Sequence, residues 1–303
     1  GQVTGVYMPS FRTPKAQSEH AISQKVALGK GRHDHRNDGR IHSVGTARNY
    51  EQALKGVAEY QQEHKLGDLR GLSVEIAQQY LADRAALVSQ KTLDLDRQAM
   101  QMHLGVRLDV VKSERETHLS TRSYTAAQVE RIASAQSERN SLATRIAHCA
   151  GLRAHELLTI RPTEERPSSG HREWSADRFT GREGERYTVE GKGGLVREVL
   201  LSRELAQQLE ATRLDEPREV TDREVHYTQH YDLAGGQAWS QSFTAASQRE
   251  LSFSNGAHGL RHSYAQERME ELQLRGINYE EAKGIVAQEV GHFDKDTTEA
   301  YLR

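Results

Sequence analysis

Apolar residues recur at three- and four-residue steps over most of this chain, and this helical spacing constrains the fold more than any other feature. One segment, 172–201, changes character: strand-like residues 186–190 and 196–201 flank the glycine-rich run 191–194, which predicts a β-hairpin. We therefore expect a mainly α fold with a small antiparallel β-sheet. The expected helices cover 46–64, 73–87, 92–103, a run from 125, 140–160, 202–209, 242–250, 258–273 and 278–290.

The helical runs fall into two groups, which predicts two domains. The first group, residues 45–115, would form a small all-helical domain, and polar residues near 105–123 would link it to a second domain over 120–303. Residues 1–40 are polar, are interrupted by proline and glycine, and hold seven Lys/Arg against three Asp/Glu, so we expect residues 1–44 to be a flexible basic arm. The polar stretch 214–241 allows no assignment.

Composition excludes several classes of protein. Hydrophobic residues make up 36% and charged residues 28% of the 303 residues, which is typical of a globular chain. No apolar run approaches the roughly 18 residues that a membrane span needs. The net charge of −2 argues against a protein that coats nucleic acid non-specifically. It does not argue against a local basic face, which is what phosphate binding requires.

The single cysteine and a group of early histidines are candidates for reactive or metal-binding groups. Cys149 alone excludes an internal disulfide framework, and its apolar helical surroundings predict a buried, inert thiol. A chain without disulfides fits a cytoplasmic location. His20, His33, His35 and His42 do not have the spacing of a standard metal site, so we expect no metal there.

Three short motifs, followed by a late tyrosine, contain residue types that phosphodiester chemistry needs. An arginine fork binds two phosphate oxygens and stays charged at ordinary pH. A tyrosine hydroxyl can form a phosphoester intermediate, although a reference pKa of about 10 means that it needs a positive pocket. The motifs are Gly151-Leu152-Arg153-Ala154-His155-Glu156-Leu157, His258-Gly259-Leu260-Arg261-His262, and Gly291-His292 with Tyr301 nine residues after the histidine.

In this order and spacing the motifs resemble the tyrosine recombinase (phage integrase) family, over most of residues 120–303 and more loosely over the helical region before it. The resemblance implies an N-terminal helical core-binding domain that places helices in the major groove. It also implies an α-rich catalytic domain with a small antiparallel β-sheet, the two forming a C-shaped clamp around double-stranded DNA. Neither a metal nor another cofactor is implied.

The resemblance assigns the phosphate-binding and reacting groups. Arg153 and Arg261 would hold the nonbridging phosphate oxygens, and Tyr301 would attack the phosphate and become linked to the DNA 3′ end. Lys192, in a Gly-Lys-Gly turn, would be the general acid for the leaving 5′-hydroxyl. Because a hairpin can shift by a residue, Arg197 is the nearest alternative to Lys192.

The resemblance also assigns supporting groups. His258 would assist proton transfer, and His292 would hydrogen-bond the phosphate. Glu156 would be the acid that supports the first arginine, and His262 would support the local helix. His155 is interpreted as incidental. Taken singly, each residue has an ordinary explanation, such as a surface arginine, a solvated hairpin tip or a packed tyrosine. The joint order and spacing favour an active site.

At the level of biology, the resemblance implies a tetramer on two DNA sites that exchanges strands through a Holliday junction. Integration or excision of a mobile element such as a phage, with an accessory directionality or DNA-bending factor, is the expected role of this DNA-associated cytoplasmic protein. Two alternatives remain: a type IB topoisomerase, which relaxes DNA as a monomer, and a non-catalytic DNA-binding regulator. Strand exchange between two defined sites would separate the recombinase from the topoisomerase.

Overall fold

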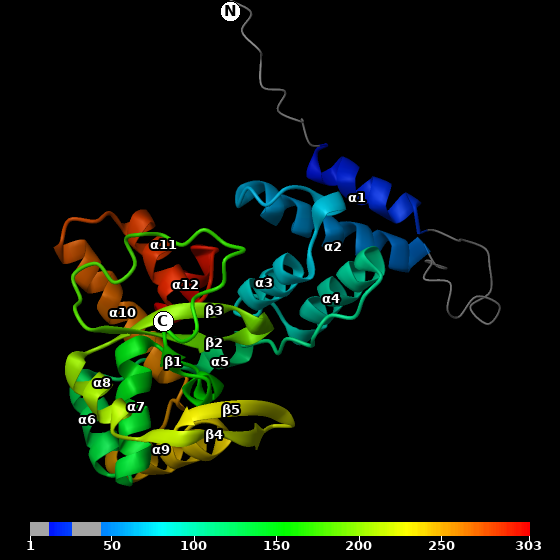
Figure 1. Ribbon diagram of the computed structural model, residues 1–303. Helices are drawn as coiled ribbons and strands as arrows, with labels where there is room; N and C mark the ends of the chain where they lie inside the picture. Colours follow the sequence, from blue (N-terminus) through cyan, green and yellow to red (C-terminus); the bar gives the residue numbers. More distant parts are fainter. Residues whose placement is uncertain (1–11, 26–43) are drawn as a thin grey trace, which may run out of the picture. The chain divides into compact units, whose positions relative to one another are not determined.

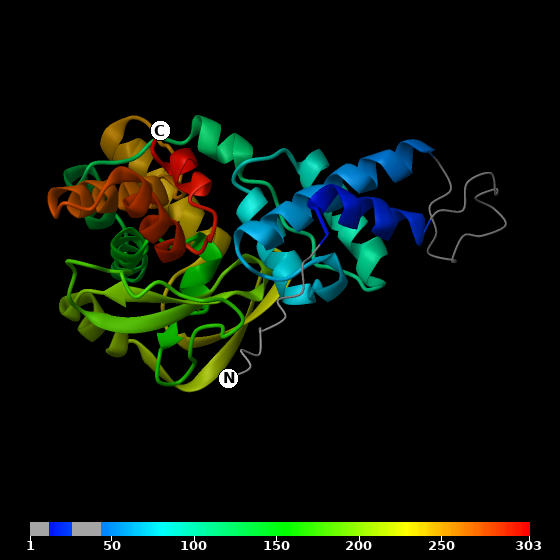
Figure 2. The same ribbon diagram turned by 90° about the horizontal axis from the view of Figure 1, so that it is seen from above.

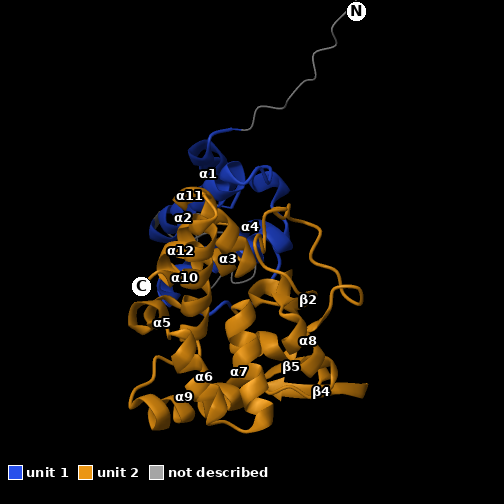
Figure 3. Ribbon diagram, turned by 90° about the vertical axis from the view of Figure 1, so that its left-hand side faces the viewer, with its two compact units in different colours: residues 1–81, 89–112 blue, residues 82–88, 113–303 orange. Residues whose placement is uncertain are grey.

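The computed structural model describes residues 12–25 and 44–303. These residues divide into two compact units: the described residues up to Leu81 with Ser89–Lys112, and Ala82–Val88 with Ser113–Arg303 (Figure 3). The fold is mainly α with small antiparallel sheets, which confirms the expected fold class. None of the helices in the described part has both the length and the apolar character that crossing a membrane requires.

The first unit is helical throughout its described residues. Local signals define both ends of helix α4 (Gln90–Leu104). Ser89 accepts a hydrogen bond from the amide of Thr92 at the start, and Gly105 takes a left-handed φ of 70° at the end. Helix α2 packs against both α1 and α4 (Figure 1). The elements are α1 (Pro14–Ser23), α2 (Val44–Glu63), η1 (Leu69–Gly71), the first part of α3 (Val74–Arg84) and α4 (Gln90–Leu104).

Helix α1 corrects the expectation that residues 1–40 are irregular. Proline and glycine in residues 1–40 predict irregular structure, but Pro14 occupies the first turn of a helix, where the missing amide proton costs nothing. Thr13 accepts a hydrogen bond from the amide of Ala16 and so caps the helix. The remainder of the expected arm, residues 1–11 and 26–43 with His33, His35 and His42, lies outside the described residues; His20 is on α1.

The second unit contains both sheets. Its main core joins α6, α7, α9 and the larger sheet, and a second cluster joins α10, α11 and α12 and includes Tyr301. The C-terminal helices, coloured orange to red in Figure 2, lie side by side. The helices are α5 (Arg115–Ser120), α6 (Ala126–Ser134), α7 (Glu138–Ala150), η2 (Ala154–Leu158), η3 (Lys192–Gly194), α8 (Arg203–Glu210), α9 (Gly236–Leu251), α10 (Gly259–Leu274), α11 (Tyr279–Glu289) and α12 (Asp296–Tyr301). The strands are β1 (Arg161–Pro162), β2 (Glu185–Glu190), β3 (Val196–Leu201), β4 (Arg213–Asp222) and β5 (Val225–Tyr231).

The larger sheet has the strand order β1-β2-β3 and contains the predicted hairpin. Strands β2 and β3 pair antiparallel from Glu185 opposite Leu201 to Glu190 opposite Val196. Alternate β3 side chains, those of Arg197, Val199 and Leu201, are buried, as expected of a strand with one face on the core. The turn η3 therefore carries Lys192 at the end of a fixed hairpin.

A second hairpin, β4–β5, occupies part of the stretch that the sequence left unassigned. Its two-residue turn, Arg223-Glu224, has φ values of 49° and 67°. Turns of this kind usually contain Asn-Gly or Asp-Gly, which is the signal that sequence analysis relies on. Here two charged residues adopt the left-handed conformation, so the turn was missed.

Cys149 is less buried than predicted. It lies on α7 with intermediate exposure, and its thiol donates to the carbonyl of Leu200 over 3.8 Å. Burial raises the pKa of the Cys149 thiol above its ordinary value. The protonated thiol is a poor nucleophile, which agrees with the inert character that we expected.

Candidate active site

The first arginine is positioned by the end of α7. Gly151 ends this helix with a φ of 69°, and a Cβ there would lie 2.8 Å from the ring of Tyr264. Glycine is therefore required both by conformation and by space. The chain then turns so that the amide of Arg153 donates to Glu156 Oε1 at 2.7 Å, at the start of η2 rather than within a long helix as predicted.

The second arginine, Arg261, is fully buried on α10 and reaches three separate elements. Its guanidinium donates to the carbonyl of Gly151 at 2.6 Å, to the carbonyl of Val290 at 3.0 Å and to the hydroxyl of Tyr301 at 2.7 Å. One arginine thus joins the end of α7, the end of α11 and the nucleophile predicted on α12. Its Nε is buried and has no hydrogen-bond partner among the described residues.

His292 links Tyr301 to Arg153. Its Nε2 lies 3.2 Å from a guanidinium nitrogen of Arg153 and 3.4 Å from the Tyr301 hydroxyl, while its Nδ1 lies 3.2 Å from Asp83. Because arginine can only donate, Nε2 must carry the lone pair and Nδ1 the proton. Burial lowers the pKa of His292 to about 4, although Asp83 opposes this, so the ring is neutral at pH 7. His292 is a hydrogen-bond acceptor beside the tyrosine.

Lys192 and Arg197 occupy different places, which bears on the choice between them. Lys192 Nζ lies 2.8 Å from Glu114 Oε1, and the same oxygen accepts from Arg153 Nε at 2.9 Å. Arg197 instead forms a buried, bidentate pair with Glu156 and also donates to the carbonyl of Glu289 at 3.2 Å. Lys192 therefore lies on the side of Arg153 that faces Glu114, whereas Arg197 is held within the supporting framework.

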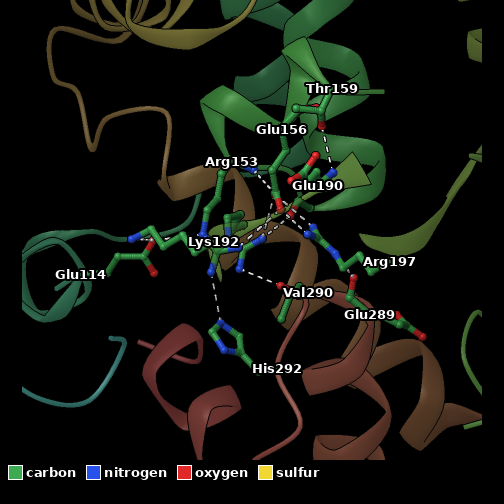
Figure 4. A network of polar contacts seen from close by, with 12 residues as sticks. Glu114, Arg153, Glu156, Thr159, Glu190, Lys192, Arg197, Glu289, Val290 and His292 are labelled. Atoms are coloured by element: carbon green, nitrogen blue, oxygen red, sulfur yellow. Dashed lines mark hydrogen bonds and ion pairs between the residues drawn. The ribbon is translucent and has the colours of Figure 1, made fainter. Parts of the chain in front are cut away.

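Two carboxylates approach Arg153 from two sides (Figure 4). Glu156 is fully buried and paired with Arg197 and Arg153, and although burial opposes ionisation these cations hold its pKa far below the ordinary value. Glu114 behaves similarly: against burial, Arg153 and Lys192 hold its pKa well below the ordinary value. Burial lowers the pKa of Lys192, with Glu114 opposing. These residues form a cluster of charged groups around the Arg153 guanidinium.

Sequence reasoning missed Glu114, His118 and Asp83. We interpreted residues 105–123 as a polar link, but they contain α5, and both Glu114 and His118 are buried. The His118 ring packs edge-on against Tyr301 with 4.5 Å between centroids. No local motif marks these residues; the i, i+4 spacing of Glu114 and His118 was the only available signal, and it is common in helices.

His258 and His262 lie at the start of α10, one turn apart. His258 is the N-cap residue, and its ring centroid lies 4.7 Å from that of His118 and 5.9 Å from that of Tyr301. His262 is fully buried, and its Nε2 lies 3.1 Å from His118 Nδ1. Burial lowers the pKa of both, that of His262 to about 4. Neutral imidazoles therefore line one side of the tyrosine.

All the residues predicted for the site thus lie in the second unit and meet around the Tyr301 hydroxyl and the Arg153 guanidinium. The members are Arg153, Glu156, Lys192, His258, Arg261, His262, His292 and Tyr301, to which the structure adds Asp83, Glu114 and His118. We call this group the tyrosine cluster. It combines a buried hydroxyl, fixed cations and neutral nitrogen bases, which is the set of groups that attack on a phosphodiester requires.

Comparison with solved structures finds site-specific recombinases. The chain is similar to the XerH recombinase in a post-cleavage complex with palindromic difH substrate, at 15% identity and a TM-score of 0.40, over 96% of this chain and 90% of that one. It is similar to XerH in a pre-cleavage complex with difH substrate (17%, 0.37, 85% and 76%). It is also similar to the XerA recombinase (13%, 0.38, 94% and 93%). No protein-family profile and no curated protein matches the chain.

Proposed function

We propose that this chain is a site-specific DNA recombinase that cleaves and rejoins double-stranded DNA through a 3′-phosphotyrosyl intermediate on Tyr301. One observation carries the proposal: the Tyr301 hydroxyl accepts a hydrogen bond from Arg261 at 2.7 Å and lies 3.4 Å from a lone-pair nitrogen of His292, which also contacts Arg153. A tyrosine held between two arginines and a neutral base is arranged for attack on a phosphate.

Each group has a part in the proposed reaction. Tyr301 Oη forms a bond to phosphorus while the bond from phosphorus to the 5′ oxygen breaks. Arg153 and Arg261 stabilise the negative charge on the nonbridging oxygens. The resemblance gives the proton-transfer role to His258 and the role of phosphate ligand to His292. We propose in addition that His292 Nε2, which lies 3.4 Å from the hydroxyl, accepts the tyrosine proton when Arg153 turns from His292 to the phosphate. Attack by a 5′-hydroxyl on the phosphotyrosine reverses the step and releases the enzyme.

Lys192 is the proposed donor of the proton that the departing 5′ oxygen receives. Burial lowers its pKa from the ordinary value, which brings an ammonium closer to the range in which it can give up a proton near neutral pH. In the structure Glu114 Oε1 contacts both Lys192 and Arg153. A phosphate that binds between the two cations would displace this carboxylate.

The proposal extends to assembly and partners. The helical region 45–115 would bind DNA beside the catalytic region 120–303, and residues 1–44 would be an accessory arm. Four copies would act on two DNA sites and exchange strands in pairs through a Holliday junction, in the integration or excision of a mobile element. No cofactor is required, because the phosphotyrosyl bond retains the energy of the broken phosphodiester.

A covalent trap tests the proposal. The protein is incubated with DNA from the region flanking its gene, carrying nicks that let the cleaved fragment leave, and is then denatured. We expect DNA with one recurrent 3′ end to stay attached to Tyr301, located by peptide mass spectrometry. Tyr301→Phe should reduce the attached DNA by more than about 1000-fold, because the nucleophile is removed. Tyr279→Phe, at an exposed tyrosine on α11, is the matched control and should retain attachment.

Two outcomes would contradict the proposal. Attachment that persists in Tyr301→Phe would mean that another residue is the nucleophile. Specific DNA binding without attachment, in a protein whose circular dichroism shows a folded state, would favour the non-catalytic regulator. Relaxation of supercoiled DNA without exchange between sites would favour a topoisomerase.

A further inference from the structure

Three histidines meet beside Tyr301, and the proposed reaction uses at most one of them. His118 comes from α5, while His258 and His262 lie at the start of α10, four residues apart and therefore on one face of the chain. One ring nitrogen from each of the three lies within 4.8 Å of the other two. His118 and His262 are buried, and His258 is partly buried.

The protons of His118 and His262 can be arranged in two ways. His118 Nδ1 lies 3.1 Å from His262 Nε2, and His262 Nδ1 lies 3.3 Å from the carbonyl of Arg303. His118 Nε2 lies 3.6 Å from Glu114 Oε2, which is an ion-pair distance and too long for a hydrogen bond. Two neutral imidazoles supply two N–H groups. If these point at His262 and at Arg303, both short contacts are hydrogen bonds; if they point at the two oxygens, the facing nitrogens of His118 and His262 both carry lone pairs and can bind a cation.

The position of His258 favours a metal ion over a proton between these nitrogens. A third proton would join His118 to His262 but would leave His258 out. His258 Nε2 is buried and has no hydrogen-bond partner among the described residues. A metal ion is the one occupant that uses nitrogens from all three rings at once, and imidazole is a common ligand for borderline divalent metals.

We propose that His118, His258 and His262 form a site for a borderline divalent metal ion such as Zn²⁺, with a fourth position left open. Zinc binds imidazole at about 2.0–2.1 Å, so two ligands of a tetrahedral ion lie about 3.3 Å apart. The 3.1 Å between His118 Nδ1 and His262 Nε2 is close to this separation. His258 would have to move toward the other two, from a separation within 4.8 Å.

The surroundings of the three rings match those of protein metal sites. A metal-binding histidine usually donates its other N–H to a carboxylate or a backbone carbonyl, which fixes the ring. Here the carbonyl of Arg303 lies 3.3 Å from His262 Nδ1, and Glu114 Oε2 lies 3.6 Å from His118 Nε2, at ion-pair distance. The Glu114 carboxylate also supplies negative charge beside His118.

A metal ion bound at this site would affect DNA cleavage, a consequence that rests on the proposed function. A metal bound to His258 would fix the rings that pack against Tyr301 and would hold His258 away from a phosphate. Metal binding should then inhibit cleavage reversibly. Binding itself needs no DNA, so it is tested separately from the recombinase activity.

The test uses the full chain with His33, His35 and His42 changed to Gln, so that these histidines cannot compete. After chelation and dialysis, Co²⁺ is titrated and followed by its visible absorption, which is intense in a tetrahedral site. We expect one equivalent to bind, with affinity at least tenfold weaker in His118→Gln and in His262→Gln. His148→Gln, which changes a histidine that pairs with Glu267 on the other side of α10, is the matched control and should bind as the parent does.

Two results of the titration would contradict the proposed metal site. Equal affinity in the parent and in both cluster variants, or no binding by the parent at micromolar Co²⁺, would overturn the site. If a variant fails to fold, X-ray absorption of the Zn²⁺-loaded parent replaces it: three imidazole ligands support the proposal, and fewer than three overturn it. A failed covalent trap leaves this result untouched, and a failed metal titration leaves the recombinase proposal untouched.

Discussion

Two buried ionic clusters lie in the same unit and differ in how completely their polar atoms are satisfied. In the first, Glu289 accepts from Arg268 with both oxygens, from the Tyr264 hydroxyl at 2.7 Å and from the amide of Phe179 at 2.8 Å. Arg268 also donates to Glu271 and to the carbonyl of Thr180. Every polar side-chain atom of Arg268 and Glu289 thus has a partner within the described chain.

The tyrosine cluster is incomplete by comparison. Arg261 Nε, Glu114 Oε2, His118 Nε2 and His258 Nε2 are buried and have no hydrogen-bond partner among the described residues. Burying a polar atom without a partner costs about 1–3 kcal/mol. A protein that carries several such atoms in one place keeps capacity for a ligand there. The comparison teaches that two buried ionic clusters of one unit can differ in this respect: Arg268 and Glu289 have a partner for every polar side-chain atom, whereas the tyrosine cluster keeps four such atoms without one among the described residues.

The largest effect on stability should come from the first cluster, formed by Arg268, Glu289, Tyr264 and Glu271, which we call the satisfied cluster. Glu289→Gln keeps the shape but removes the buried counter-charge of Arg268 and leaves the more exposed Glu271 as its counter-charge. Losing one partner of a buried pair costs about 3–5 kcal/mol. Urea unfolding measures this loss. Glu271→Gln removes a more exposed partner of the same arginine and should cost much less. Equal costs for the two variants would show that Arg268 and Glu289 are not the structural centre we describe.

A change of pH should act on the tyrosine cluster next. Burial lowers the pKa of His262, His292 and the neighbouring His155 to about 4 each. Because the unfolded value is about 6.5, the unfolded chain binds more protons below that pH. Stability is therefore complete above about pH 6.5 and is lost as pH falls toward 4. The urea midpoint should be lower at about pH 5 than at about pH 7.5.

A matched variant sharpens the pH prediction. His292→Gln removes one of the titrating rings and should reduce the difference between the two urea midpoints. The satisfied cluster contains no histidine, so substitution of Glu271 should leave the difference as it is. A midpoint that does not fall between the two pH values would contradict the burial of neutral histidines in the tyrosine cluster.

The smallest effect should be a gain in anion affinity. Glu114→Gln removes the negative charge that contacts Arg153 and Lys192, so inorganic phosphate should bind about tenfold more tightly, in keeping with a charged hydrogen bond of about 1.5 kcal/mol. Isothermal titration near neutral pH measures the change. Glu116→Gln, on the exposed face of the same helix, is the control. Unchanged or weaker phosphate binding would mean that Glu114 does not compete for the cations.

The two clusters also show what a sequence can predict. Arg153, Arg261, His292 and Tyr301 could be proposed because each lies in a motif that, in order and spacing, resembles a known family. Asp83, Glu114 and His118 could not be proposed, because no local sequence pattern marks them. They contact the tyrosine cluster only because of where α3 and α5 lie in the folded chain. The β2–β3 hairpin was predictable from its glycines. The β4–β5 turn was not, because its left-handed residues are Arg223 and Glu224, which are not typical of such turns.

Gly151 has a consequence for anyone who maps tolerance to substitution along this chain. The residue takes no part in the proposed chemistry, yet its left-handed φ and its closeness to Tyr264 both restrict it. Its carbonyl accepts a hydrogen bond from Arg261, and a substitution that changed the backbone there would disturb this contact. Selection for activity would treat position 151 as strictly as Tyr301. A survey that scores activity alone would rank the two positions together, and only a parallel measure of folded protein would tell a reacting group from the bend that holds it in place.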